Sequence, residues 1–191
     1  MIIGLAGKIE SGKDTVGSYL VVQHGFTHFA FADAIKKEID LCFKNDYIPL
    51  PFINTVNWLS VKRLYENRWN KPYAPEVRKL LQWWGTEFRR ARNPDYWVNV
   101  LLTELAARFQ NPSKPNIVIT DVRFENEAEW IKDHGGVVWL VKRGATYDDP
   151  NIKTHVSERF CETYNKWDRI IENTGTRSNL YKEINLAREG M

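Results

Sequence analysis

Short apolar runs alternate with longer amphipathic stretches along most of this chain. Five of the runs predict strands, at 2–6, 27–32, 116–121, 137–141 and 169–171. Apolar residues at helical spacing predict helices over 13–22, 33–43, 125–134, 155–164 and 176–188. Strands that alternate with helices favour an α/β fold, in which a parallel sheet carries helices on both faces.

The long segment between the second and third predicted strands has helical periodicity instead. Helices are expected over 58–69, 75–85 and 94–109, the last opened by Asn93 as N-cap and Pro94 at the first helical position. Residues 45–111 are therefore expected to form an all-helical insertion. The polar stretch 143–159 is expected to act as a lid, within a single domain that spans 1–191.

Composition narrows the function further. The chain has 191 residues, a net charge of +3, and 43% hydrophobic and 27% charged residues, which fits one globular domain. The longest basic cluster is Arg89-Arg90-Ala91-Arg92, which is too short for the basic stripe of a nucleic-acid-binding protein. Cys42 and Cys161 lack the spacing of a zinc site or a disulfide framework, so reduced thiols and a cytoplasmic location are expected. The apolar N-terminus is too short for a signal peptide or a membrane span, and no membrane partner is expected.

The strongest motif lies between the first predicted strand and the first predicted helix. Residues 7–15 read Gly-Lys-Ile-Glu-Ser-Gly-Lys-Asp-Thr and match G-x-x-x-x-G-K. Backbone N–H groups of such a loop point at phosphate oxygens, the following helix adds its positive dipole end, and Lys13 bridges the β- and γ-phosphates. Asp14 stands where a metal-binding hydroxyl is usual, so it is expected to hold Mg²⁺ through water, while Thr15 contacts the α-phosphate. The alternative is a tight surface turn rich in Gly and Lys.

Three charged residues follow predicted strands, where ligands of doubly wound sheets bind. Asp33 closes the second strand and is expected to organise the acceptor side, or to cap the next helix. Asp121 ends the third strand and is expected to bind a magnesium water. Arg123 can grip a phosphate with two hydrogen bonds, or form a salt bridge with Glu125 or Glu127.

Further candidates lie in the insertion and near the predicted lid. The Gln82 amide can read a base edge, Trp83 or Trp84 can stack on a base, and one of the arginines from Arg89 onward can clamp an acceptor phosphate. Cations of the lid region, Arg143, Lys153 and His155, can close over the phosphates and exclude water. The backbone around Asn173 can edge an adenine ring.

Taken together, these blocks resemble the bacteriophage-type deoxynucleoside monophosphate kinases, a branch of the P-loop nucleotide kinases. The resemblance rests on residues 7–15, on Phe31-Ala32-Asp33-Ala34-Ile35-Lys36, and on Leu81-Gln82-Trp83-Trp84-Gly85-Thr86-Glu87 with Arg89 and Trp97. It continues in Thr120-Asp121-Val122-Arg123-Phe124-Glu125-Asn126-Glu127 and His155-Val156-Ser157-Glu158.

The resemblance implies a three-layer fold with a five-stranded parallel sheet, a helical acceptor-binding insertion and a lid. It implies transfer of the γ-phosphate of ATP, with Mg²⁺, to a deoxynucleoside monophosphate, in support of phage DNA synthesis in the host cytoplasm. Several members are dimers, so a homodimer stays open. Small nucleotides are the expected partners, without stable nucleic-acid binding.

The predicted site has four parts. The expected catalytic residues are Lys13, Asp33, Arg123 and Arg143. The expected ATP-binding residues are Gly7, Lys8, Ser11, Gly12, Lys13, Asp14, Thr15 and Asn173. The expected acceptor-binding residues are Asp33, Lys36, Gln82, Trp83, Arg89, Arg90, Trp97, Arg123 and Glu127. The expected metal-binding residues are Asp14 and Asp121.

Three alternatives stay open at this point. One is another small-molecule kinase of the same fold, for dephospho-coenzyme A or phosphomevalonate. A second is a P-loop ATPase that acts on nucleic acid, which predicts a basic face and ATP hydrolysis stimulated by DNA. A third is a degenerate P-loop protein with a structural role.

Overall fold

The computed structural model describes residues 1–45, 69, 75–109, 115–144 and 156–191. The predicted helix over 58–69, apart from Trp69, lies outside these residues, as do Lys153, His155 and most of the predicted lid. The chain divides into two compact units, one formed by Met1–Phe31 with Leu102–Met191 and the other by Ala32–Leu101. Within the described residues, no helix has the length and apolar character needed to cross a membrane.

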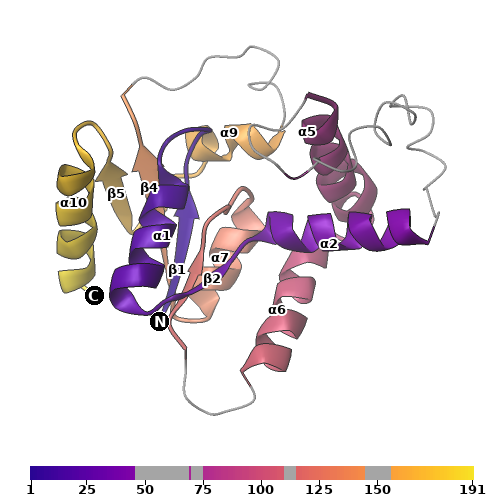
Figure 1. Ribbon diagram of the computed structural model, residues 1–191, viewed down its shortest axis with the longest axis horizontal. Coiled ribbons are helices and arrows are strands. Elements are labelled where there is room, and N and C mark those ends of the chain that lie inside the picture. The colour runs from indigo at the N-terminus through magenta and orange to yellow at the C-terminus, as the bar shows by residue number, and fades with distance from the viewer. Residues whose placement is uncertain (46–68, 70–74, 110–114, 145–155) are drawn as a thin grey trace. The chain divides into compact units, whose positions relative to one another are not determined.

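The first unit is built on a five-stranded sheet in which every pairing is parallel (Figure 1). The strand order is β2-β3-β1-β4-β5, with β1 in the centre. Gly4 of β1 pairs with Ile119 on one side and with Val138 on the other. The bounds of the strands are β1 (Ile2–Ala6), β2 (Thr27–Phe29), β3 (Ile117–Ile119), β4 (Val137–Lys142) and β5 (Arg169–Glu172).

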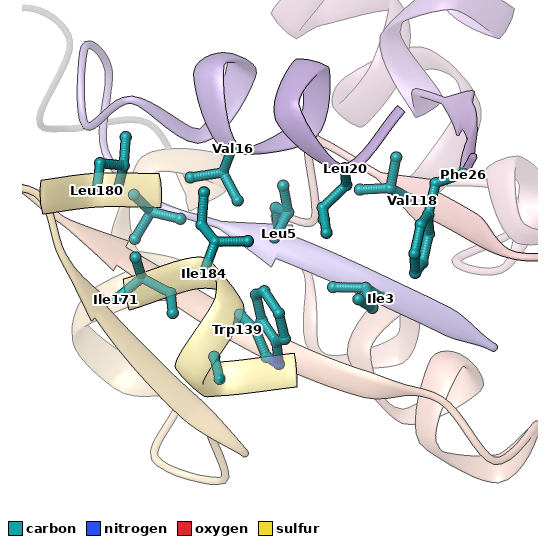
Figure 2. Packing of buried hydrophobic residues seen from close by; sticks show 12 residues of the cluster. Ile3, Leu5, Val16, Leu20, Phe26, Val118, Trp139, Ile171, Leu180 and Ile184 are labelled. Atoms are coloured by element: carbon teal, nitrogen blue, oxygen red, sulfur yellow. The ribbon is translucent and has the colours of Figure 1, made fainter. Parts of the chain in front are cut away.

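Helices cover both faces of this sheet because side chains alternate along the buried central strand. On one face, Ile3 and Leu5 pack against helices α1 (Lys13–His24) and α10 (Arg177–Glu189), as Figure 2 shows. On the other face, Gly4 approaches α7 (Glu125–Asp133) so closely that a Cβ would lie 2.5 Å from Cδ1 of Ile131. The predicted parallel sheet with helices on both faces is therefore confirmed. A further short helix, α9 (Val156–Thr163), precedes β5.

The second unit is helical. It contains nearly all of α2 (Phe31–Lys44), α5 (Pro75–Gln82), the π-helix η2 (Trp83–Arg90) and the first turns of α6 (Tyr96–Arg108). Its core holds the buried rings of Trp84 and Trp97. A Cβ on Gly85 would lie 2.9 Å from Cδ1 of Ile35, so a residue without a side chain allows η2 to approach α2 closely. The predicted insertion over 45–111 stays a prediction, because α2 already belongs to the second unit and α6 crosses its boundary.

Three of the predicted bounds that differ from the structure do so for a local reason. The second strand ends at Phe29 rather than at Ala32, because the carboxylate of Asp121 accepts a hydrogen bond from the Phe31 N–H and α2 begins there. The helix expected to end near residue 85 continues as the π-helix to Arg90. Pro94 does not open α6, because Asn93 forms a turn in which its carbonyl accepts a 3.1 Å hydrogen bond from the Tyr96 N–H.

Candidate active site

The predicted phosphate loop joins the end of β1 to the start of α1. The Ser11 N–H donates to the Lys8 carbonyl (3.1 Å), and the Val16 N–H donates to the Gly12 carbonyl as α1 begins (3.0 Å). Gly12 has φ 98°, in the left-handed region that favours glycine. The ammonium of Lys13 turns back and donates to the Lys8 carbonyl at 3.2 Å. The loop is thus a compact turn at the N-terminus of a helix, with a lysine folded back to it.

The ends of β4 and β5 hold this loop from the side. Asn173, directly after β5, donates from Nδ2 to the Ser11 carbonyl at 2.9 Å, and from its backbone N–H to the Lys142 carbonyl at 2.7 Å. A Cβ on Gly7 would lie 2.7 Å from the Val141 carbonyl oxygen, so the loop also runs close to β4. The Ser11 hydroxyl is buried and has no hydrogen-bond partner among the described residues.

A pocket of about 290 Å³ opens beside the loop. Its lining joins two predicted ATP-binding residues, Lys8 and Ser11, to the predicted catalytic residue Arg143, which is exposed just after β4. Lys8 also forms a 2.7 Å ion pair with Glu162 of α9. Cations from the loop and from the start of the predicted lid therefore face one space.

Asp121 and Asp14 are the two predicted metal-binding residues. Asp121 follows β3, next to the strand that leads into the loop, and its Oδ1 accepts the Phe31 N–H at 2.8 Å. Asp14 is exposed in the first turn of α1. Among the described residues no group of three or more acidic, histidine or cysteine side chains gathers to hold a metal. Mg²⁺ usually takes one or two carboxylates together with substrate phosphates and water, so two carboxylates beside a phosphate loop fit this ion.

Glu127 has a role that the sequence did not reveal. Its side chain is 1% exposed, and its Oε2 accepts the backbone N–H groups of Arg123 at 2.7 Å and Phe124 at 3.1 Å. The carboxylate thereby caps the start of α7 and fixes the backbone that carries Arg123. This geometry gives Glu127 a positioning role, in place of the predicted direct contact with an acceptor.

Two predicted acceptor-binding residues in the second unit are core residues instead. Trp97 is 1% exposed, and its indole N–H donates to the Gly85 carbonyl at 2.9 Å. Arg90 is 8% exposed and donates to the Pro94 carbonyl at 2.9 Å. Both predictions of an acceptor contact are therefore corrected: burial leaves no face of the Trp97 ring for stacking, and the Arg90 guanidinium is used by the chain itself.

The other predicted acceptor-binding residues of this unit lie along α2, α5 and η2. Asp33 is in the first turn of α2 rather than at a strand end, and it forms a 2.9 Å ion pair with Lys36. Gln82 ends α5, and half-buried Trp83 opens η2, stacked on Phe88 with the ring centroids 5.2 Å apart. Partial exposure keeps these side chains available to a ligand.

Glu38 of α2 is the residue that sequence reasoning missed. It accepts hydrogen bonds from Nε1 of Trp84 (2.9 Å), Nε of Arg89 (2.5 Å) and the hydroxyl of Tyr96 (2.8 Å). The pKa of Tyr96 is raised mainly by burial and also by its hydrogen bond to Glu38. The pKa of Cys42 is raised mainly by burial and also by the negative charge of Glu38. In the sequence, Glu38 is marked only by its place beside the apolar stripe of an amphipathic helix. Many solvated carboxylates have the same place.

A parallel sheet whose central strand leads into a glycine-rich, lysine-bearing loop at a helix N-terminus defines a P-loop fold. Solved structures share this fold. Shikimate kinase from Aquifex aeolicus aligns with a TM-score of 0.51 at 20% identity and covers 100% of this chain and 97% of its own. A protein from Thermus thermophilus aligns with a TM-score of 0.52 at 19% identity, with the same coverage.

The sequence comparisons identify the family. Residues 46–184 match the family described as deoxynucleotide monophosphate kinase. A protein of Acanthamoeba polyphaga mimivirus, named "Putative deoxynucleotide monophosphate kinase", is 31% identical over 198 residues, which cover 96% of this chain and 94% of that protein. The chain belongs to the deoxynucleotide monophosphate kinase family. The predicted family and the predicted fold class are both confirmed.

Proposed function

We propose that this protein transfers the γ-phosphate of ATP to the phosphate of a deoxynucleoside monophosphate, giving the diphosphate and ADP. The predicted enzyme class, an ATP-dependent deoxynucleoside monophosphate kinase, agrees with the family to which the chain belongs. ATP binding is supported chiefly by the phosphate loop, in which Lys13 donates a hydrogen bond to the Lys8 carbonyl and Asn173 donates one to the Ser11 carbonyl. Family membership, rather than the fold, separates this activity from those of other P-loop kinases.

On the donor side, the N–H groups of the loop and the start of α1 bind the ATP phosphates. Lys13 leaves the Lys8 carbonyl and bridges the β- and γ-phosphates, while Thr15 contacts the α-phosphate. The Ser11 hydroxyl is buried without a hydrogen-bond partner among the described residues, which costs free energy. A phosphate bound at this loop would supply the missing partner. Lys8 and Arg143 line the neighbouring pocket and would add positive charge.

Mg²⁺ is the metal that fits best. Asp14 and Asp121 would hold it, mainly through water. Two carboxylates near a triphosphate suit a hard cation that keeps several water ligands. When bound, the ion neutralises charge that builds up during transfer.

On the acceptor side, the residues proposed to bind the acceptor phosphate are Arg123 and Arg89, and the other residues proposed to bind the acceptor are Asp33, Lys36, Gln82 and Trp83. An oxygen of the acceptor phosphate forms a bond to the γ-phosphorus as the bond to the β-phosphate oxygen breaks. The acceptor is already a dianion, so no strong base is needed, and catalysis is mainly positioning and electrostatics. Supply of DNA precursors in a phage-infected cell, a possible homodimer and the lack of stable nucleic-acid binding stay predictions.

The test is an acceptor screen. The purified protein is incubated with ATP and Mg²⁺ and with dAMP, dCMP, dGMP, dTMP or the corresponding ribonucleotides, and ADP formation is followed. We expect fast turnover that depends on at least one deoxynucleotide and is lost in the Lys13→Ala variant. Equal ADP formation without any acceptor would indicate an ATPase, and no ADP in any mixture would rule the proposal out.

A further inference from the structure

The carboxylate of Glu38 is surrounded by donors from two other helices. Trp84 Nε1 and Arg89 Nε, both of η2, donate to Oε1, and Tyr96 of α6 donates to Oε2. Nη2 of Arg89 also forms an ion pair with Oε1. The Glu38 side chain is 17% exposed and the Arg89 side chain 29% exposed. A half-buried carboxylate with this many partners is held in one orientation, and it holds its partners in turn.

The π-helix is what brings two of these donors together. Trp84 and Arg89 are five residues apart, and hydrogen bonds of η2 run between residues five apart, as from the Ala91 N–H to the Thr86 carbonyl at 3.0 Å. In an α-helix, residues five apart would lie about 140° around the axis from each other. A π-helix places them roughly one turn apart on one face. The unusual helix therefore lets a single carboxylate contact both side chains.

Arg89 also contacts two aromatic rings. Its guanidinium carbon lies 4.7 Å from the ring centroid of Phe88 and 4.8 Å from that of Tyr96. Nε and Nη2 face Glu38, and within the described part of the chain Nη1 has no hydrogen-bond partner. The planar group is thus locked in place with a defined set of N–H donors left over. An arginine in this state suits an anion that it can bind without reorganisation.

We propose that Glu38 is a positioning residue that orients Arg89 toward the phosphate of the acceptor nucleotide. This inference rests on the proposed function, in which Arg89 binds that phosphate. In this role Glu38 fixes the orientation of Arg89. Its own negative charge disfavours binding of a phosphate dianion nearby, so the benefit comes from geometry and not from charge. A role in geometry and a role in charge therefore predict opposite results for two conservative substitutions.

Glu38→Gln keeps the geometry and removes the charge. Its amide oxygen can still accept from Trp84 and Arg89, and its NH₂ group can donate to the Tyr96 hydroxyl. Glu38→Asp keeps the charge, but it is one methylene too short to keep all the contacts. We expect Glu38→Ala and Glu38→Asp to raise the KM for the acceptor by about tenfold, and Glu38→Gln to stay within about threefold of wild type. The KM for ATP should change less than about twofold in all three.

The experiment measures both KM values and kcat for wild type and the three variants, with melting temperatures to monitor folding. Arg92→Ala is the matched control. Arg92 lies two residues after η2, stacks on Phe88 and donates to the Phe88 carbonyl, but it has no contact with Glu38 among the described residues. In an Arg89→Ala background, Glu38→Ala should cause no further rise in the acceptor KM.

Several results would overturn the inference. An active wild type whose acceptor KM is unchanged by Glu38→Ala and by Glu38→Asp would show that Glu38 does not position the acceptor site. Equal rises in the KM for ATP and for the acceptor, or an additive effect in the Arg89→Ala background, would assign Glu38 a general structural role. Absence of acceptor-dependent activity in the wild type would instead reject the proposed function itself.

Discussion

The side chain of Asn173 donates a hydrogen bond from Nδ2 to the Ser11 carbonyl at 2.9 Å, across 162 positions of the sequence. The same side chain lies against Gly12, where a Cβ would overlap Nδ2. A residue at the end of β5 therefore helps to set the shape of the loop that follows β1. The loop owes its conformation to the sheet edge as well as to its own glycines, and so it can be formed before ATP binds.

Gly12→Ala should damage this loop. The new Cβ would meet Asn173 and would impose a side chain on a residue with φ 98°. Gly25→Ala is the control, because Gly25 also has a positive φ, 66°, but has open space around it. Both variants should lose about 1–2 kcal/mol of stability from backbone strain. Only Gly12→Ala should also raise the KM for ATP, and equal KM values in the two variants would count against the predicted loop function.

Lys13→Ala should lose most of the catalytic rate while keeping the fold. The lysine ammonium is proposed to stabilise charge on the transferred phosphate, and removal of one such group typically costs about 100-fold or more in kcat. Lys182→Ala, on the exposed face of α10, is the control for the loss of a surface cation. Kinetics and thermal melting of both variants provide the check. Near-full activity of Lys13→Ala would contradict the assigned role.

The pH dependence of stability should report on Tyr164. Burial raises the pKa of Tyr164 to about 12, and the Glu129 carboxylate, 3.4 Å from the hydroxyl, contributes to the shift. Because the pKa in the unfolded chain is about 10, the stabilising contribution is complete below pH 10 and is lost as the pH rises toward 12. Tyr164→Phe should therefore show a shallower fall in the free energy of unfolding over that range. An absorbance titration in which all eight tyrosines of the chain ionise together near pH 10 would contradict this.

The three inner strands were predictable because β1, β3 and β4 are local apolar runs that are buried along nearly their whole length. The bounds of two helices were harder to predict, since they depend on contacts from elsewhere. The first residue of α2, Phe31, donates to Asp121, which lies 90 positions along the chain. The π-helix depends on packing around Trp84 and Gly85 rather than on a composition that differs from that of an ordinary helix.

The conformation of the phosphate loop was predictable because its motif fixes both residue type and spacing. Residues 7–15 form the expected loop, and the pocket brings Lys8, Ser11 and Arg143 together. Elsewhere the sequence could not separate ligand contacts from the core, because Trp97 and Glu127 have the chemistry for either role. Only burial showed that each of these two side chains bonds to the chain's own backbone. Glu38 was not predicted, because a carboxylate on an amphipathic helix is usually solvated and nothing in the sequence marks this one as an exception.

Asp121 offers a way to separate structure from metal binding. Its Oδ1 accepts the Phe31 N–H, and the same carboxylate is proposed to hold a magnesium water. Asp121→Asn keeps an acceptor oxygen but removes the charge, whereas Asp121→Ala removes both. The alanine variant should therefore lose about 1 kcal/mol of stability through the missing helix cap, and the asparagine variant much less.

Both substitutions should raise the Mg²⁺ concentration needed for half-maximal activity, because the ion loses a negatively charged partner in each. The measurement is a Mg²⁺ titration of the rate at saturating nucleotides, together with melting temperatures. Asp14→Asn is the comparison, since Asp14 is exposed on α1 and should affect the Mg²⁺ requirement without the loss of the helix cap. If Asp121→Asn kept the wild-type Mg²⁺ dependence while Asp121→Ala lost stability, the carboxylate would serve only the fold, and the ion would have to be held by other groups.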